Sequence, residues 1–177
     1  MGKWSMYRRR GGRGPVGPAP FVNPVTLASY LASEDASDDL DGTQAWVGQR
    51  FTAASPADVT AGTGRFRNVT GNVGSVVEAV FTWTGTLPGT LIGASDPVAC
   101  STFVGAFTTV PFTWSTPLNL PAAGEYVRAY GVSGGPAIQF RAGTASATGL
   151  VIYAMTSGVW AAHSGDRGLW GTLAGLD

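Results

Sequence analysis

The sequence predicts an all-β protein in which antiparallel strands form a sandwich or barrel, preceded by an extended basic arm and one short helix. Three observations predict this class. Short runs of alternating apolar and polar residues are separated by turn residues. The chain has 26 Gly and 11 Pro among 177 residues, which suits frequent turns. It also has only one Lys and three Glu, so long surface helices stabilised by Glu–Lys pairs are not expected.

Charge divides the chain into three parts, although the formal net charge is zero. Residues 1–33 carry a charge of +5, residues 34–41 carry −5, and the remainder is balanced. Only 12% of the residues are charged, about half of the ~25% that is usual in soluble domains. A composition that is 44% apolar can bury a core, so the chain as a whole is not expected to be disordered.

The N-terminal residues 1–22 have neither helical nor strand periodicity, and their Gly and Pro residues predict an extended arm. Residues 23–44 are then expected to form a short helix and an acidic linker. Asn23 and Pro24 would start the helix, and Leu27, Tyr30 and Leu31 would form its apolar face. The chain lacks a signal-peptide pattern and a long apolar run, so we expect no membrane span.

From Ala45 onward, seven runs read as strands, with Thr102–Ser115 expected to contain two. The runs are Gln49–Ala53, Arg65–Thr70, Ser75–Thr84, Thr102–Ser115, Glu125–Ser133, Ala137–Arg141 and Leu150–Thr156. The last run is apolar on both faces, which predicts a central, covered strand. Alternation assigns one buried face in each of several strands. These faces carry Phe81 with Trp83, Val110 with Phe112 and Trp114, and Ile138 with Phe140.

Three segments give the sequence a resemblance to a known module. They begin at Val47-Gly-Gln-Arg-Phe-Thr, at Leu87-Pro-Gly-Thr-Leu-Ile-Gly-Ala-Ser and at Val110-Pro-Phe-Thr-Trp-Ser. Over about residues 46–141 the chain resembles the jelly-roll module of bacteriophage tail and virion proteins and of bacterial surface proteins. The resemblance implies an antiparallel jelly-roll-like β-sandwich used for assembly or glycan binding. An arm on such a body is similar to actinobacteriophage-type minor tail or capsid-associated proteins.

The expected organisation therefore has four parts. Residues 1–22 form a docking arm, 23–44 a short helix and acidic linker, 45–157 the jelly-roll β-sandwich, and 158–177 an apolar C-terminal docking segment. The last segment is apolar enough that we expect it to be buried, in this chain or in a partner. A strand and short turn that close the body are the alternative interpretation of the same residues.

The arm holds the first group of candidate binding residues. Guanidinium groups and aromatic rings suit anchoring on an acidic, grooved neighbour, whereas nucleic-acid binding or a weakly held tail are the alternatives. The candidate docking residues are Trp4, Tyr7, Arg8, Arg9, Arg10 and Arg13.

A second candidate site lies on the run Glu125–Ser133. Tyr126, Arg128 and Tyr130 alternate with Val127 and Ala129, which predicts a stripe for glycan or protein recognition if its face is exposed. The alternative is that this face packs against the second sheet.

Asp39 and Asp41 are candidate calcium ligands, because Ser37, Asp39, Asp41 and Gly42 partly match the EF-hand spacing. The alternative interpretation of this acidic run is a solvated loop or a partner for the basic arm of another copy. We expect no other metal and no cofactor. His163 and Asp166 are residue types found in the catalytic triads of hydrolases. The side chains of a triad must meet in space from a rigid scaffold, which neighbouring residues of a Gly-containing turn rarely do. Cys100 lies in an apolar run and is expected to be a buried small hydrophobe.

These features predict a non-enzymatic phage virion protein, most simply a minor tail protein with virion localisation. It would dock on other virion proteins and form homo-oligomers, with a trimer as one option. A carbohydrate-binding module for a host glycan and a capsid decoration or head-fibre protein are the alternatives. Nucleic acid is not the expected partner, because the whole chain carries no net positive charge.

Overall fold

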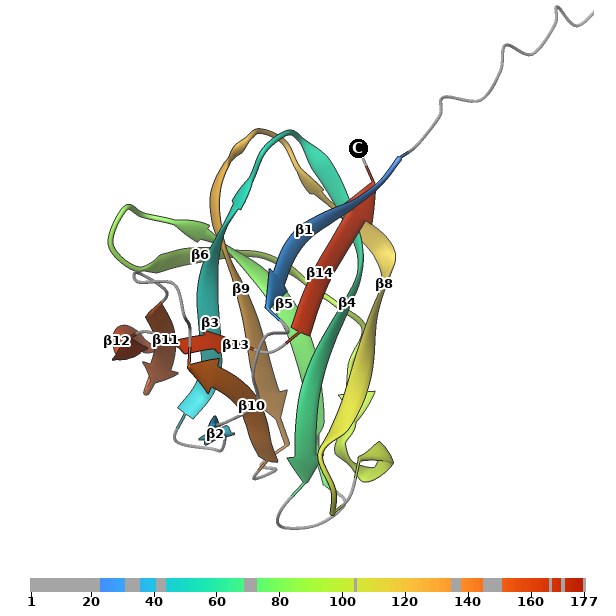
Figure 1. Ribbon diagram of the computed structural model, residues 1–177, viewed down its shortest axis with the longest axis vertical. Coiled ribbons are helices and arrows are strands. Elements are labelled where there is room, and N and C mark those ends of the chain that lie inside the picture. Colours follow the sequence, from blue (N-terminus) through green and yellow to red (C-terminus); the bar gives the residue numbers. More distant parts are fainter. Residues whose placement is uncertain are drawn as a thin grey trace, which may run out of the picture.

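The computed structural model describes residues 23–30, 36–40, 44–68, 73–103, 105–134, 138–144, 151–165, 167–169 and 171–176. In this part of the chain two antiparallel sheets of seven strands each form a sandwich (Figure 1). The all-β class and the jelly-roll-like sandwich are therefore confirmed. Apart from the 3-10 turn η1 (Cys100–Thr102), the described elements are strands. No helix of the described residues is long and apolar enough to span a membrane.

Sheet A has the order β1-β14-β4-β10-β13, with β8 paired to β4 and β2 paired to β10. Its strands are β1 (Pro24–Tyr30), β2 (Ala36–Leu40), β4 (Ala57–Asn68), β8 (Thr108–Leu120), β10 (Ile138–Thr144), β13 (Arg167–Leu169) and β14 (Gly171–Leu176). Sheet B has the order β12-β11-β3-β9-β5-β6, with β7 paired to β5. Its strands are β3 (Gln44–Ala53), β5 (Ser75–Trp83), β6 (Pro88–Ala94), β7 (Val98–Ala99), β9 (Gly124–Ser133), β11 (Val151–Thr156) and β12 (Val159–Gly165).

The connectivity is jelly-roll-like because the chain crosses between the sheets several times. From β3 in sheet B it passes to β4 in sheet A, returns to β5, and later passes from β8 in sheet A to β9 in sheet B. Strand β9 therefore lies between β3 and β5, although β5 precedes it by several strands. Such non-sequential pairing is how Greek-key and jelly-roll sheets cover their strands.

Two apolar clusters fill the sandwich. One surrounds Phe66, Phe112 and Tyr130, and the other surrounds Trp114 and Leu173. The predicted inward positions Val110, Phe112, Trp114, Ile138 and Phe140 are buried, as expected from the alternation. The prediction is wrong for Phe81 and Trp83, which lie on the face of sheet B that points away from sheet A, where Trp83 is only partly buried. Cys100 is also fully buried, which confirms its interpretation as a small hydrophobe.

The predicted helix at the start of the body is wrong. Residues Pro24–Tyr30 form strand β1, which pairs with β14 from Pro24 opposite Leu176 to Tyr30 opposite Gly171. The pairing with β14 supplies hydrogen-bond partners to the backbone, and Leu27 packs against the core. Tertiary pairing thus overrides the local capping pattern. Leu31 lies outside the described residues.

The acidic linker is also a strand in part. β2 pairs with β10, where Leu40 lies opposite Ile138, and the Leu40 side chain is fully buried. Alternate side chains of a strand point to opposite faces, so Leu40 can reach the core while Asp39 stays exposed. Within the predicted helix and linker, Pro24–Tyr30 and Ala36–Leu40 are therefore strands of the sandwich.

The C-terminal segment closes the body instead of forming a separate docking element. β14 lies between β1 and β4, and Leu169 and Leu173 are fully buried. The expected burial is confirmed, and of the two interpretations the strand is the one observed. Figure 1 shows β1 and β14 side by side beside β4.

Three smaller expectations need correction. Residues of the run Thr102–Ser115 contribute one strand, β8, preceded by the turn η1, rather than two strands. The run Leu150–Thr156 contains β11, which lies between β12 and β3, one strand from the sheet edge, and is not central. His163 lies in strand β12 and not in a polar turn, since the β11–β12 turn falls earlier, at Ser157 and Gly158.

Candidate functional site

The centre of the sandwich contains an ion pair that joins two neighbouring strands of sheet B. Glu78 on β5 is 0% exposed and Arg128 on β9 is 3% exposed. Nε of Arg128 donates a hydrogen bond of 2.7 Å to Oε1 of Glu78. Charged side chains are almost never fully buried unless they are paired, so these two residues mark the interior as unusual.

Arg128 also crosses the sandwich to sheet A. Its Nη2 donates a 2.5 Å hydrogen bond to the backbone oxygen of Thr63 on β4, and a second hydrogen bond to the hydroxyl of Tyr130. The Tyr130 hydroxyl in turn donates to the same Thr63 oxygen at 2.9 Å. The pair and its partners therefore connect β5, β9 and β4, between the two apolar clusters of the core.

Two glycines of sheet A make room for this network. A Cβ at Gly62 would collide with the carboxylate of Glu78. Gly171 has a φ of +137°, and a Cβ there would collide with the Thr63 oxygen, Nη2 of Arg128 and the Tyr130 hydroxyl. Only glycine tolerates such a φ at low energy and leaves the backbone this close to a side chain.

Burial changes the titration of both charged groups. Desolvation raises the pKa of the Glu78 carboxyl above its ordinary value of 4.5, more than the attraction of Arg128 lowers it. Burial also lowers the pKa of Arg128, against the attraction of Glu78. Both shifts disfavour the charged forms because the interior solvates ions poorly.

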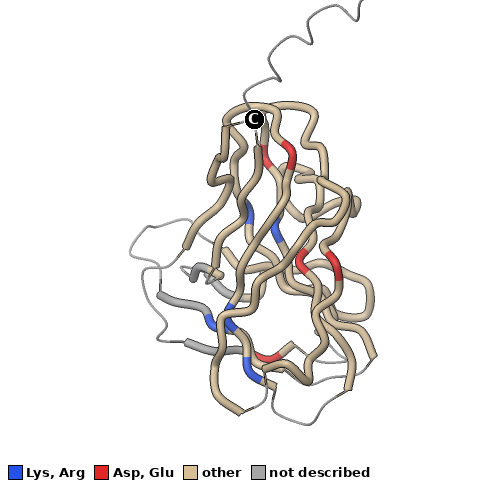
Figure 2. Tube along the Cα trace, turned by 90° about the vertical axis from the view of Figure 1, so that its right-hand side faces the viewer, with Lys and Arg blue, Asp and Glu red and all other residues tan. Residues whose placement is uncertain are grey.

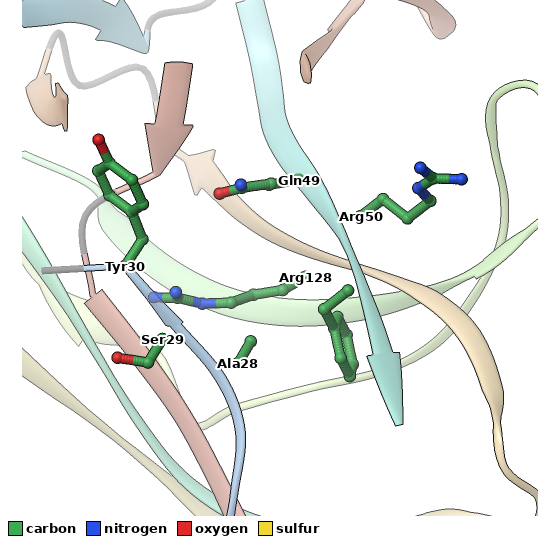
Figure 3. A pocket seen from close by; sticks show the side chains of 7 residues that line it. Ala28, Ser29, Tyr30, Gln49, Arg50 and Arg128 are labelled. Carbon is green, nitrogen blue, oxygen red and sulfur yellow. The ribbon is translucent and has the colours of Figure 1, made fainter. Parts of the chain in front are cut away.

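A pocket reaches this network from the surface. A cavity of about 230 Å³ opens between β1 and β3, and Arg128 is one of its lining residues. Figure 3 shows the Arg128 and Gln49 side chains extending in the same direction, toward Tyr30 and Ser29 of β1, while Arg50 points away. The inner end of the pocket is therefore formed by a buried guanidinium and a side-chain amide.

The Gln49 amide is held in a defined orientation. Its Oε1 accepts a 2.8 Å hydrogen bond from the backbone N–H of Leu169, the last residue of β13. Because the carbonyl oxygen is engaged in this way, the amine Nε2 is left as a donor. Sheet register places Gln49 directly opposite Arg128 on β9, so both side chains project to the same face of the sheet.

The outward face of sheet B carries a second unusual feature, which we call the outer aromatic layer. Trp46 packs edge to face on Phe81 with ring centroids 5.2 Å apart, and Phe81 does the same with Trp160 at 5.3 Å. Trp83 and Tyr153 form a further pair at 5.3 Å. The layer consists of Trp46, Phe81, Trp83, Tyr153, Met155 and Trp160 above Val127 and Ala129.

The predicted recognition stripe is not exposed, and that expectation is wrong. Tyr126, Arg128 and Tyr130 are 9%, 3% and 0% exposed. They face the sandwich interior, while Val127 and Ala129 face the outer aromatic layer. Strand β9 is covered on both faces, because sheet A packs on one face and the outer aromatic layer covers the other. The alternative, that this face packs against the second sheet, is the one observed.

The calcium interpretation does not match the backbone. Asp39 lies in strand β2, whose extended pairing with β10 differs from the coiled loop of an EF-hand. Its Oδ1 accepts a 2.9 Å hydrogen bond from Nε2 of Gln139, and Asp41 lies outside the described residues. No group of three or more His, Cys, Asp or Glu residues that could hold a metal occurs in the described ranges.

The predicted docking residues of the arm lie outside the part of the chain that the structure describes. They are Trp4, Tyr7, Arg8, Arg9, Arg10 and Arg13. Glu78 and Gln49 lie in no sequence motif that predicts a site. One signal was available for Glu78: it occupies the face of its strand opposite Phe81, between the apolar residues Val76 and Val80. A carboxylate there implies either an exposed face or a buried partner.

Comparisons with known proteins place few limits on the function. No protein-family model matches the chain, and no curated protein matches it. A chain in the structure of infectious bursal disease virus strain Gt is 14% identical with a TM-score of 0.36, covering 88% of this chain and 40% of that one. A chain of strain Gx is 12% identical with a TM-score of 0.31, covering 90% and 39%. This protein thus spans about 40% of the length of those chains, and a likeness of this size carries no argument about its function.

Proposed function

We propose that this chain is a non-enzymatic structural protein of a virus particle, specifically a bacteriophage minor tail protein. In this proposal the β-body forms homo-oligomers and residues 1–22 attach it to other virion proteins. The observation that carries the proposal is the outer aromatic layer on sheet B. Further support comes from the jelly-roll-like sandwich and from the sequence resemblance over residues 46–141.

The outer aromatic layer is unlike a face that meets only water. An antiparallel sheet in a sandwich usually shows polar residues on its outward face. Here Trp46, Trp83 and Tyr153 remain only partly buried on that face. Leu91 on β6 lies opposite Phe81 and is 47% exposed, which extends the apolar surface. Aromatic residues of this kind are enriched at protein interfaces, so the layer suits a second copy of the chain.

Low charge supports the same use of the surface. Lys, Arg, Asp and Glu are sparse along the described trace (Figure 2). The ion pair between Arg50 and Glu125, 2.9 Å apart, lies at the margin of the layer, with Arg50 5.3 Å from the Trp83 ring centroid. Interface cores are depleted in charged residues while their rims are polar. The layer and this pair reproduce that arrangement.

The oligomer is tested by placing a charge on the layer. Leu91→Asp should shift the full chain toward a smaller species in size-exclusion chromatography with light scattering, because a carboxylate would be buried in the interface. Val73→Asp is the matched control, since Val73 is 57% exposed and lies outside the layer. A wild-type protein that is monomeric at every concentration would contradict the oligomer, as would equal shifts in the two variants.

Attachment is tested by deleting residues 1–22. The truncated protein should still fold, because the described strands begin at Pro24, but it should no longer join particles. Normal copy number in purified particles would refute the anchoring role. A cryo-EM map of the particle then separates the minor tail protein from the capsid decoration or head-fibre alternative.

The three residues predicted to bind a carbohydrate are not available at the surface. Tyr126, Arg128 and Tyr130 are covered by the sandwich, so they cannot stack on a glycan at the surface. No other described feature favours a host glycan over a second copy of the chain on the outer aromatic layer. Glycan-array binding by the body that is abolished by Leu91→Asp would replace the oligomer with a glycan as the partner.

A further inference from the structure

The pocket between β1 and β3 is an opening into the interior of the sandwich. Strand β1 is the edge of sheet A at this point. The pairing of β11 with β3 reaches only as far as Ile152 opposite Gln49. Beyond Gln49, neither β11 nor another described strand pairs with that side of β3. The two strand edges therefore bracket a gap through which the interior can be reached.

The guanidinium of Arg128 has N–H donors that remain available to a ligand in this gap. Its hydrogen bonds use Nε, to Glu78, and Nη2, to Thr63 and Tyr130. The two N–H groups on Nη1 make no hydrogen bond to the described part of the chain. An arginine presents five N–H donors in a planar fork. Arg128 is only 3% exposed and lines the pocket, so an acceptor bound there would be in reach of its remaining donors.

The pocket is lined by donors and apolar groups. The Gln49 and Arg128 side chains extend in the same direction (Figure 3), and Oε1 of Gln49 already accepts a hydrogen bond from Leu169. Ser29 adds an exposed hydroxyl, and Ala28 and Phe51 add apolar walls. None of the described lining residues carries a carboxylate. Glu78 lies on the other side of the guanidinium, at Nε.

This chemistry fits one class of ligand. A carboxylate is planar and can accept in parallel from an Arg nitrogen and a neighbouring amide, which makes strong charge-assisted hydrogen bonds. A dianion such as phosphate suits the site less well, because Glu78 already offsets the charge of Arg128. The volume of about 230 Å³ is below the ~300–1,000 Å³ of pockets for drug-sized ligands, so the ligand must be small.

We propose that this pocket binds a small molecule bearing a single carboxylate. Nη1 of Arg128 and Nε2 of Gln49 would donate to the carboxylate oxygens. Phe51 and Ala28 would contact the carbon skeleton of the ligand. The site is separate from the outer aromatic layer, because Arg128 and Gln49 project to the inner face of sheet B. The oligomer and the ligand can therefore be tested independently.

The test is a titration of the ¹⁵N-labelled full chain with glucuronate, followed by NMR. Acetate tests the carboxylate alone, and methyl glucoside tests the neutral sugar ring. Shifts should concentrate on the amides of residues 28–30 and 49–51 and on the guanidinium of Arg128 with both acids. The neutral sugar should leave these signals unchanged.

Gln49→Glu is the informative variant, because substitution of Arg128 would leave Glu78 buried without its partner and could unfold the protein. The new carboxylate can still accept from Leu169 N–H, but it removes the amine donor and repels an anion. Loss of one charge-assisted hydrogen bond should weaken glucuronate binding on the order of tenfold. Gln139→Glu is the matched control, since Gln139 pairs with Arg67 and Asp39 away from the pocket.

The outcomes distinguish a ligand-binding role of Arg128 from a purely structural role. Wild-type and Gln139→Glu proteins should bind glucuronate alike, and Gln49→Glu should bind it weakly. The proposal is overturned if neither acid shifts the pocket signals. It is equally overturned if Gln49→Glu, with an otherwise native spectrum, binds glucuronate as tightly as wild type.

Discussion

Nε of Arg128 lies 2.7 Å from Oε1 of Glu78 in the interior of the sandwich, and the two residues stand on adjacent strands, β9 and β5. Apolar clusters occupy the core on both sides of them. A slip of either strand by one residue would turn one charge to the outer face and leave the other unpaired in the core. The pair therefore disfavours other registers of β5 against β9.

Removing one member of this pair should be strongly destabilising. Arg128→Met leaves the Glu78 carboxylate buried without its partner, which typically lowers the free energy of unfolding by about 3–5 kcal/mol. The double variant Glu78→Met with Arg128→Met should recover much of that loss. Urea denaturation of the wild type, both single variants and the double variant measures the coupling.

The Arg50–Glu125 pair provides the surface comparison. Its atoms are 2.9 Å apart, but both side chains are 44% exposed. Arg50→Met should therefore change the free energy of unfolding by less than about 1 kcal/mol. If both arginine variants lose the same stability, burial is not what makes the interior pair important.

Stability should depend on pH through Glu78. Its pKa is raised in the folded state above the ordinary 4.5, so between these two values the folded protein binds more protons than the unfolded chain. The free energy of unfolding contributed by this group is therefore greatest below pH 4.5 and falls as pH rises through the folded pKa. The titratable side chains beside Glu78 are Arg128, which donates a hydrogen bond to it, and Tyr130, which lies opposite it on β9.

The measurement is urea denaturation of the wild type and Glu78→Gln at several pH values from acid to neutral. The stability difference, wild type minus variant, should decrease as pH rises over this window and then level off. A difference that increases with pH would mean that Arg128 lowers the pKa of Glu78 more than burial raises it.

Gly62 should not tolerate even a methyl group. In Gly62→Ala the new Cβ would occupy the position of the Glu78 carboxylate, and crowding of this kind commonly lowers stability by about 1–3 kcal/mol. Gly124→Ala is the control, because its Cβ would meet only the Tyr126 ring at 4.0 Å. Thermal unfolding of the two variants compares them. Equal midpoints would show that the interior network can move aside.

Cys100 should be unreactive in the folded protein. Its side chain is fully buried, and burial raises the pKa of the thiol to about 11. At pH 8 very little thiolate would be present, and a disulfide reagent would have no access to it. We expect negligible modification by a chromogenic disulfide in buffer and one modified thiol per chain in denaturant. Rapid modification in buffer would indicate that the loop around η1 opens.

The sequence pattern predicted most of the strands. It was wrong where the structure of a segment depends on pairing with a strand far away in the chain. Alternation located β5, β9 and the inward residues Ile138 and Phe140 correctly. It could not foresee that Pro24–Tyr30 pairs with the far end of the chain. The Asn-Pro start and the spacing of Leu27 and Tyr30 favour a helix locally, and the partner strand that overrides them lies beyond any local window.

The prediction of an exposed recognition site on β9 was wrong for a related reason. Alternation correctly grouped Tyr126, Arg128 and Tyr130 on one face of β9, but periodicity does not say whether that face is exposed. The answer depends on β3 and β5 flanking β9 and on sheet A covering it. Alternation alone therefore does not show whether a polar stripe on a strand is exposed or buried. A residue of opposite charge at an apolar position elsewhere in the chain indicates that the stripe is buried. Here that charge is Glu78, which is 50 positions from Arg128 in the chain.

The position of β14 has a consequence for the order in which this protein can be made. β1 pairs only with β14 among the described strands, and β14 in turn joins it to β4. Of the described strands, β1 leaves the ribosome first and β14 last, so β1 must wait for β14 before it acquires a hydrogen-bonded neighbour. Sheet A can be completed only after translation of the body has finished, and loop closure over such a separation is slow. During that interval the exposed edge of β4 could accept β14 from another chain, so nascent copies produced close together are at risk of exchanging this strand.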